Sequence, residues 1–137
     1  MNRQDLQDLS EVRLKEARAL LKEGLWDGAY YLAGYSIECA LKACIARSTA
    51  QFDFPEKKKV DASYSHELDA LVKVAGLEPA LKAQIKNNPV FRRYWETTEE
   101  WSEQSRYERN AEKAARELIT AIDDQRYGIL VWIKQHW

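Results

Sequence analysis

Glycine and proline are scarce in this sequence, with five and three residues among 137. Turns between β-strands depend on these residue types, so their scarcity argues against a hairpin-rich fold and favours a few long helices. The sequence also lacks the G-x-G-x-x-G and G-x-x-x-x-G-K patterns of glycine-rich phosphate loops. We therefore expect an all-α protein without such a loop.

Cysteine and histidine are rare as well. Cys39 and Cys44 lie five residues apart on a predicted helix, roughly 140° apart around its axis, so they cannot form a disulfide with each other. Buried thiols are inert, which excludes a cysteine nucleophile. The two histidines, His66 and His136, belong to no H-E-x-x-H or E-x-x-H pattern. We expect no metal site and no cofactor.

No single sign of charge dominates, since 21 basic residues stand against 22 acidic ones and the net charge is −1. This balance produces no long-range attraction to DNA or to an anionic membrane. A signal peptide and a run of about 18 apolar residues are both missing. With two reduced thiols, these features predict a cytoplasmic protein that forms a single globular domain over residues 1–137.

Apolar residues recur at three- and four-residue steps, the period of amphipathic helices. The predicted helices span residues 3–23, 26–47, 66–75, 78–87, 89–102 and 110–123, followed by an apolar terminal segment at 129–133. Residues 48–64 are predicted to form a surface loop. Gly24 and Gly76 are expected to end helices, and Ser65, Asn88 and Asn110 to begin them. The predicted architecture is an antiparallel up-and-down bundle of four to five helices.

The predicted helix at 26–47 is apolar on nearly all sides, which is typical of the centre of a bundle or of a subunit interface. Gly34 would allow another helix to approach closely. The five tryptophans and seven tyrosines exceed what one small core comfortably hides. We expect homodimerisation through this second helix and the apolar terminal segment.

Glu38 and Lys42 are nearly the only charged residues in that helix. Glutamate four residues before lysine is the favourable order for a helical ion pair. The pair is interpreted either as structural or as a partly buried carboxylate that is held for function. A buried charge is costly unless paired, so Glu38 should have a cation from another element, with Arg106 and Arg109 as candidates.

His66 and an arginine–aromatic region could carry chemistry. Histidine is the natural acid–base group near neutral pH, but His66 could equally satisfy a helix N-terminus. Arginines alternate with aromatic residues at 91–95 and 101–109, a composition that stacks bases and holds phosphates, although aromatics at helical spacing also fill cores and interfaces. The glutamates within this region oppose nucleic-acid binding: Glu96, Glu99, Glu100 and Glu103.

Four segments resemble the HEPN family, named for nucleotide binding in higher eukaryotes and prokaryotes. They are residues 31–43 of the second helix, His66-Glu-Leu-Asp-Ala-Leu, Arg106-Tyr107 and the ending at 128–137. The resemblance implies a helical bundle that is usually a homodimer. Small members are often encoded beside a minimal nucleotidyltransferase in toxin–antitoxin-like pairs, and many members are metal-independent ribonucleases.

The sequence departs from the ribonuclease pattern that active members carry, an arginine followed after four to six residues by a histidine. Arg47 lies far upstream of His66, and nine residues separate Arg126 from His136. We expect a non-catalytic HEPN module that homodimerises and binds a nucleotidyltransferase partner, a nucleotide or both. The ligand-binding positions implied by the resemblance are Glu38, Lys42, His66, Arg106 and Tyr107.

Two alternatives stay open. The first is a metal-independent ribonuclease with a degenerate site, in which His66, Arg106 and Glu38 meet at the bundle surface. RNA cleavage needs a base for the 2′-hydroxyl and a cation for the phosphate, and these residue types supply both. The second alternative is a structural adaptor that binds no ligand.

Overall fold

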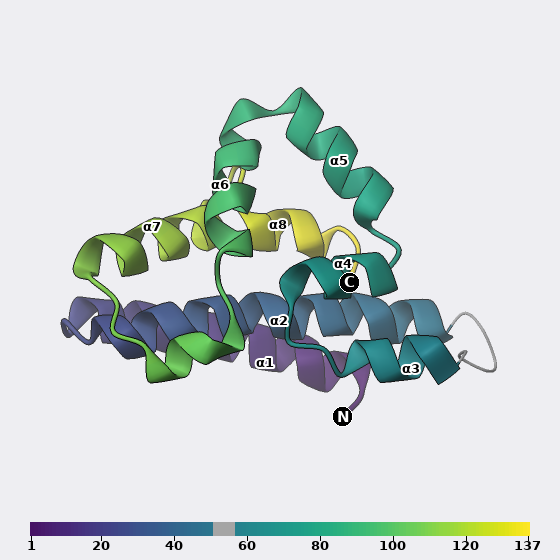
Figure 1. The fold of residues 1–137 in the computed structure, drawn as a ribbon, viewed down its shortest axis with the longest axis horizontal. Helices are drawn as coiled ribbons and strands as arrows, with labels where there is room; N and C mark the ends of the chain where they lie inside the picture. The colour runs from purple at the N-terminus through teal and green to yellow at the C-terminus, as the bar shows by residue number, and fades with distance from the viewer. Residues whose placement is uncertain (51–56) are drawn as a thin grey trace.

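Two long antiparallel helices form the base of the protein in a computed structural model that describes residues 1–50 and 57–137 (Figure 1). They are α1 (Arg3–Lys22) and α2 (Trp26–Ala50). Asn2 begins α1 with a capping box in which its side chain accepts from the backbone N–H of Asp5. Gly24 follows the end of α1 with φ +77, a left-handed conformation that favours glycine and confirms the predicted helix end.

In the described residues, seven shorter elements follow this pair along the chain. They are α3 (Lys57–Ser63), α4 (Leu68–Val74), α5 (Glu78–Asn87), α6 (Pro89–Glu99), the 3₁₀-helix η1 (Glu103–Tyr107), α7 (Glu112–Asp123) and α8 (Ile129–Lys134). The part of the chain that the structure describes contains no strand, so the all-α prediction is confirmed. There are more helices than the four or five expected, because turns divide the second half into short pieces.

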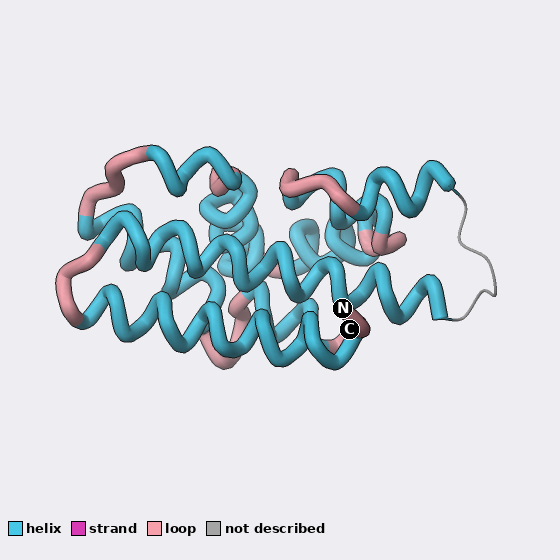
Figure 2. The backbone as a smooth tube through the Cα atoms, turned by 90° about the horizontal axis from the view of Figure 1, so that it is seen from below, coloured by secondary structure: helices cyan, strands magenta, loops and turns pink. Residues whose placement is uncertain are grey.

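The α1–α2 pair has two different sides. Helices α7 and α8 run along one side, whereas α3, α4 and η1 cover the other, and α5 and α6 rise away from the base (Figure 1). The marks of the two termini lie close together in Figure 2, and the Arg3 guanidinium donates to a main-chain oxygen of Trp137 at 3.1 Å. Within the described ranges, no helix is both long and apolar enough to cross a membrane.

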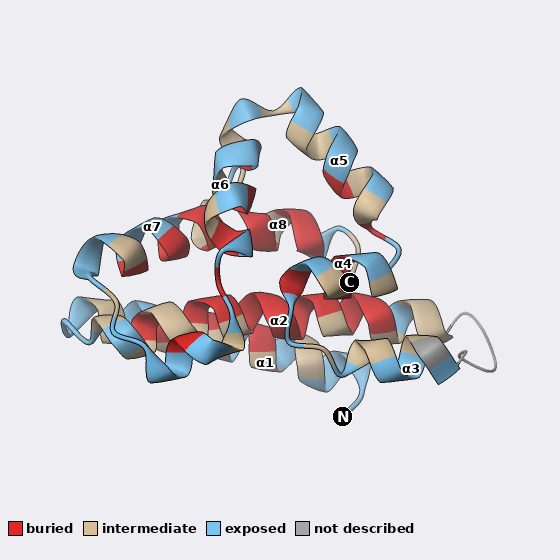
Figure 3. Ribbon diagram, viewed as in Figure 1, coloured by how far each residue is buried: buried red, intermediate tan, exposed pale blue. Residues whose placement is uncertain are grey.

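The core is centred on α2, as its apolar character predicts (Figure 3). Three of the five tryptophans, Trp95, Trp101 and Trp132, are buried within the single chain. Helix α8 likewise buries its apolar side chains internally: Ile129, Leu130, Trp132 and Ile133. The terminal helix therefore does not offer the apolar face that we expected for a dimer, because the chain itself covers that face.

The predicted loop at 48–64 is wrong where the structure describes it. Helix α2 continues to Ala50, and Lys57–Ser63 forms α3. The basic run lacks apolar periodicity, so this pattern does not predict a helix there, although lysine and alanine are good helix formers. The remainder of the predicted loop, including Phe52 and Phe54, lies outside the described residues.

Two predicted helix starts are also wrong. Asn110 does not cap α7, whose N-cap is Ala111; instead, the Asn110 backbone N–H donates to the Asp27 carboxylate. Ser65 accepts from the backbone N–H of Glu67, the residue that precedes α4. His66 consequently lies in the connection before α4 and is not part of a helix. Asn88, by contrast, caps α6 as predicted.

Candidate functional site

Glu38 is the centre of the candidate site. It lies in the middle of α2 and is only 1% exposed. One carboxylate oxygen, Oε1, accepts from Lys42 Nζ at 3.0 Å and from His66 Nδ1 at 2.7 Å. Burying a carboxylate in this way is tolerable only when cationic donors compensate for the lost hydration. Lys42 of the same helix supplies a cation to Glu38, and His66 supplies the contact from another element. The expected partners Arg106 and Arg109 are not paired with Glu38.

His66 lies between two carboxylates. Its Nδ1 faces Glu38, and its Nε2 lies 3.1 Å from Glu103 Oε2, which belongs to η1. Both ring nitrogens are therefore within hydrogen-bond distance of a carboxylate oxygen. In this arrangement neither nitrogen is left without a protein partner.

Arg106 joins the site through Glu103 rather than directly. Its Nη2 donates to Glu103 Oε1 at 3.0 Å, and its guanidinium lies 4.8 Å from the ring centre of Tyr107, which is 71% exposed. The result is one continuous chain of charges, which we name the Glu38 cluster; its members are Lys42, Glu38, His66, Glu103 and Arg106. Four of the five predicted ligand-binding residues belong to it, and the fifth, Tyr107, lies beside it.

Sequence reasoning missed Glu103, which was considered only as a charge that opposes nucleic acid. Its spacing of three residues from Arg106 was the available signal. Its contact with His66 joins segments 37 residues apart and has no local signature. Arg109 and His136 lie outside the cluster. His136 instead packs against Trp132 with ring centres 4.9 Å apart, and burial, followed by the charge of Arg47, lowers its pKa.

Gly34 fixes η1 against α2. A Cβ atom at this position would lie 2.2 Å from the ring of Trp101, so only glycine lets the indole lie on the helix backbone. The Trp101 ring also stacks on Tyr31 at 6.1 Å. We predicted that Gly34 would admit a neighbouring helix, but an indole side chain occupies the space. This contact sets the position of Glu103 two residues later.

Buried polar atoms without a hydrogen-bonding partner gather on the same side of α2. Within the described residues they are Glu38 Oε2, Trp101 Nε1, Ser105 Oγ and Asn110 Nδ2. Buried polar groups are nearly always satisfied, and exceptions concentrate where water, a ligand or another chain completes them. All four belong to α2 or to the segment 101–110.

The two thiols are not part of a reactive site. Burial, followed by the negative charge of Glu38, raises the pKa of Cys39 to about 11. Burial raises the pKa of Cys44 to about 12. Both are free thiols, as predicted, and both stay protonated near neutral pH. Across the described chain, no three histidine, cysteine, aspartate or glutamate side chains are grouped to hold a metal ion.

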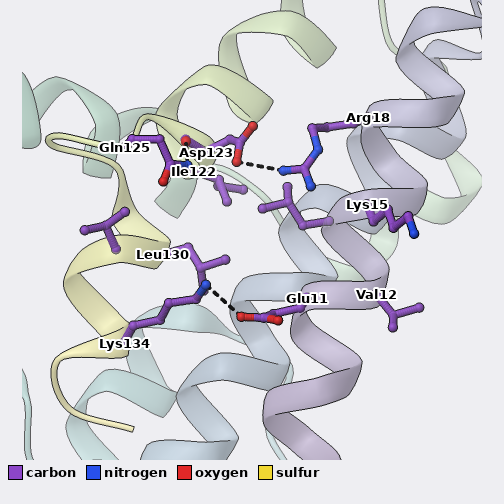
Figure 4. A pocket seen from close by; sticks show the side chains of 11 residues that line it. Glu11, Val12, Lys15, Arg18, Ile122, Asp123, Gln125, Leu130 and Lys134 are labelled. Carbon is purple, nitrogen blue, oxygen red and sulfur yellow. Dashed lines mark hydrogen bonds and ion pairs between the residues drawn. The ribbon is translucent and has the colours of Figure 1, made fainter.

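The opposite side of the α1–α2 pair contains a groove of about 410 Å³ between α1, α7 and α8, which we name the α1–α8 groove (Figure 4). Two ion pairs cross it: Arg18 with Asp123 at 2.7 Å and Lys134 with Glu11 at 2.8 Å. Each carboxylate is thus neutralised by a cation from the facing helix. The lining of this groove contains both signs of charge, with the cations Lys15, Arg18 and Lys134 and the carboxylates Glu11 and Asp123.

Comparison with known proteins gives one match. The family model described as HEPN domain matches residues 4–127, which include every member of the Glu38 cluster. No curated protein and no solved structure matches the chain.

Proposed function

The chain belongs to the HEPN family, and on this basis we propose that it is a non-catalytic HEPN module of the cytoplasm. The proposed module forms a homodimer and binds a minimal nucleotidyltransferase partner, a nucleotide or both, in a toxin–antitoxin-like pair. The observation that carries the proposal is the double engagement of His66 by Glu38 and Glu103.

This engagement argues against catalysis. A general base for RNA cleavage must accept the proton of a 2′-hydroxyl, which requires an unprotonated ring nitrogen within hydrogen-bond reach. Both nitrogens of His66 instead face carboxylate oxygens at hydrogen-bond distance. Arg106 is also paired with Glu103, which opposes its use as a phosphate-binding cation. The absent Arg-x4-6-His spacing agrees with this interpretation.

The Glu38 cluster fits a recognition role. It brings cations and carboxylates to one side of α2, and His66 and Arg106 are each close to half exposed. Half-buried aromatic rings continue the same side, with Tyr31 stacked on Tyr35 at 6.0 Å. Aromatic and arginine side chains beside unsatisfied buried polar atoms are the composition of interface hot spots. We therefore place the proposed dimer or partner contact here and away from α8.

A metal-independent ribonuclease remains the second candidate, because Glu38, His66 and Arg106 do gather in one cluster. In that reaction a base would take the proton of the 2′-hydroxyl, whose oxygen would attack phosphorus while the 5′-oxygen leaves with a proton. His66 could act as that base only after one of its ring nitrogens left its carboxylate partner.

One set of measurements tests both candidates. The full-length chain is incubated with single-stranded RNA in buffer containing EDTA, beside His66→Ala and the matched control His136→Ala, which removes the other histidine. We expect no cleavage by any of the three. Cleavage by the wild type and by His136→Ala that His66→Ala lacks would overturn the non-catalytic proposal and establish the ribonuclease.

The association part is tested by light scattering and by purification from the native host. We expect a particle of twice the 16.0 kDa chain mass, together with stoichiometric recovery of a nucleotidyltransferase. Tyr31→Ala combined with Tyr35→Ala should weaken the dimer, whereas Leu25→Ala, an exposed apolar residue elsewhere on the surface, should not. A monomer that recovers no nucleotidyltransferase and binds no nucleotide would contradict the proposed module.

A further inference from the structure

A second groove lies beside the Glu38 cluster, between the beginning of α1, the C-terminal half of α2 and α3. Its volume is about 850 Å³, roughly twice that of the α1–α8 groove and within the range of about 300–1,000 Å³ that small-molecule sites occupy. We name it the α3 groove. Lys42 lines it and also belongs to the Glu38 cluster, so the two features share a side chain.

Three cations line the α3 groove, one from each of its helices: Arg3 from α1, Lys42 from α2 and Lys59 from α3. Among the described lining residues none is aspartate or glutamate. This is unexpected in a chain with 22 acidic and 21 basic residues, where charges of both signs are otherwise interspersed. The groove therefore concentrates positive charge on a protein whose overall field is close to neutral.

Two of these cations have partners other than a carboxylate side chain. Arg3 donates to a main-chain oxygen of Trp137, the last residue of the sequence, and Lys59 donates to the uncharged hydroxyl of Ser48 at 2.6 Å. Only Lys42 faces a carboxylate, and Glu38 uses one of its three N–H donors. Glu38 thereby holds the Lys42 ammonium in place and leaves it with further donors.

The remaining lining is largely apolar. Leu6 from α1 and Ile45 from α2 are among the aliphatic side chains there, and Tyr64 contributes an aromatic ring that is 74% exposed. A ligand that fits needs an anionic group of several charges and a flat apolar body. A nucleotide has both, because its phosphates match the cations and its base can stack on an exposed ring.

We propose that the α3 groove is the nucleotide site of this protein, with Arg3, Lys42 and Lys59 on the phosphates and Tyr64 on the base. The inference rests on the nucleotide arm of the proposed function and assigns that ligand to a place next to the Glu38 cluster rather than within it. Because Lys42 contacts Glu38, phosphate binding at the groove is coupled to the Glu38–His66 contact and so to the proposed partner surface.

The test is calorimetric titration of the full-length chain with the four ribonucleoside triphosphates in EDTA, with inorganic triphosphate and adenosine as probes for the two halves of the ligand. Lys59→Glu is compared with Lys15→Glu, which makes the same change of charge in the α1–α8 groove. We expect Lys59→Glu to weaken nucleotide binding at least tenfold and Lys15→Glu to leave it unchanged. Tyr64→Ala should weaken nucleotide binding about fivefold and leave triphosphate binding unchanged, as expected for a stacking contact of about 1 kcal/mol.

The outcomes separate this inference from the proposed function. Nucleotide affinity that survives Lys59→Glu but is lost in Arg106→Glu would overturn the α3 groove and return the ligand to the Glu38 cluster. A wild type that binds none of the four nucleotides would overturn the groove together with the nucleotide arm. The proposed binding of a partner would then be tested separately, by the measurements of particle mass and co-purification.

Discussion

The two sides of the α1–α2 pair use charge in opposite ways. On the α7–α8 side, Arg18 with Asp123 and Lys134 with Glu11 pair across the α1–α8 groove, between exposed side chains of facing helices. On the α3–η1 side, a buried carboxylate gathers cations, and the neighbouring α3 groove keeps positive charge without carboxylates among its described lining residues. Exposed pairs contribute little to the free energy of unfolding, whereas a buried charge is expensive unless it is paired.

The largest expected effect comes from removing the buried charge of Glu38. Glu38→Gln removes the negative charge that Lys42 and His66 share, and breaking a buried ion pair costs about 3–5 kcal/mol. Both partners are partly exposed and can regain water, so we expect a loss of about 3 kcal/mol. Urea denaturation measures the free energy of unfolding.

The matched control lies on the other side. Glu11→Gln removes one partner of the pair with Lys134, in which both side chains are well exposed. Exposed pairs contribute about 0–1 kcal/mol, so this variant should stay within that range. Equal losses for Glu38→Gln and Glu11→Gln would refute the distinction between the two sides.

The second effect concerns the attachment of η1. Gly34→Ala drives a methyl group into the ring of Trp101, and overpacking of this kind costs about 1–3 kcal/mol. Gly28→Ala in the same helix is the control, because its Cβ would meet only the terminal methyl of Leu20 at 3.1 Å, which can move. Near-neutral stability is expected for this control, since alanine is the better helix former. Equal decreases in the unfolding midpoints of Gly34→Ala and Gly28→Ala would show that the loss of glycine, and not the clash with the Trp101 indole, destabilises Gly34→Ala.

Much of the fold could be predicted from local signals in the sequence. Gly24 and Gly76 end helices with positive φ, and Asn88 begins one, because these roles depend on a few neighbouring residues. The apolar residues on nearly all sides of α2 predicted that this helix is buried. Helix α3 was missed because its basic residues carry no periodic apolar face, although the backbone there is helical.

The site was less predictable because its contacts join distant segments. The need of Glu38 for a cation followed from the cost of burying charge, but its main tertiary partner, His66, lies 28 residues away. The second bond of His66 to Glu103 depends on where Trp101 places η1, and that in turn depends on the glycine at position 34. Each step is a packing event without a sequence pattern.

A smaller effect is expected at the junction of α7 and α8. Tyr94 donates to Asp124 at 2.7 Å, and this bond, with the backbone N–H groups of Arg126 and Tyr127, lowers the pKa of the Asp124 carboxyl below its usual value. A depressed carboxyl pKa stabilises the fold above the unfolded-state value, and the contribution is lost as pH falls through the folded-state value. Tyr94→Phe should therefore destabilise the protein at pH 7 and lose its effect near pH 2.

Acid titrations of the free energy of unfolding, followed by circular dichroism, measure this difference. Tyr127→Phe is the control, since only the backbone N–H of Tyr127 bonds to Asp124. A Tyr94→Phe deficit that is equal at pH 7 and pH 2 would assign the loss to packing and not to the carboxylate.

The smallest effect separates the two cysteines, which report on different surroundings of α2. Cys39 follows Glu38, whose charge adds to burial in raising the pKa of the thiol, whereas Cys44 faces the carbonyl of Ile133 in α8 at 3.9 Å. Removing that charge in Glu38→Gln should lower the pKa of Cys39 and so increase its thiolate fraction and its rate of alkylation. Global unfolding exposes both thiols together and therefore does not change the ratio of Cys39 to Cys44 modification. This ratio, read by mass spectrometry after iodoacetamide treatment, isolates the effect of the Glu38 charge on Cys39. We expect this ratio to rise severalfold, and an unchanged ratio with both rates increased would mean that Glu38 acts on Cys39 only through overall stability.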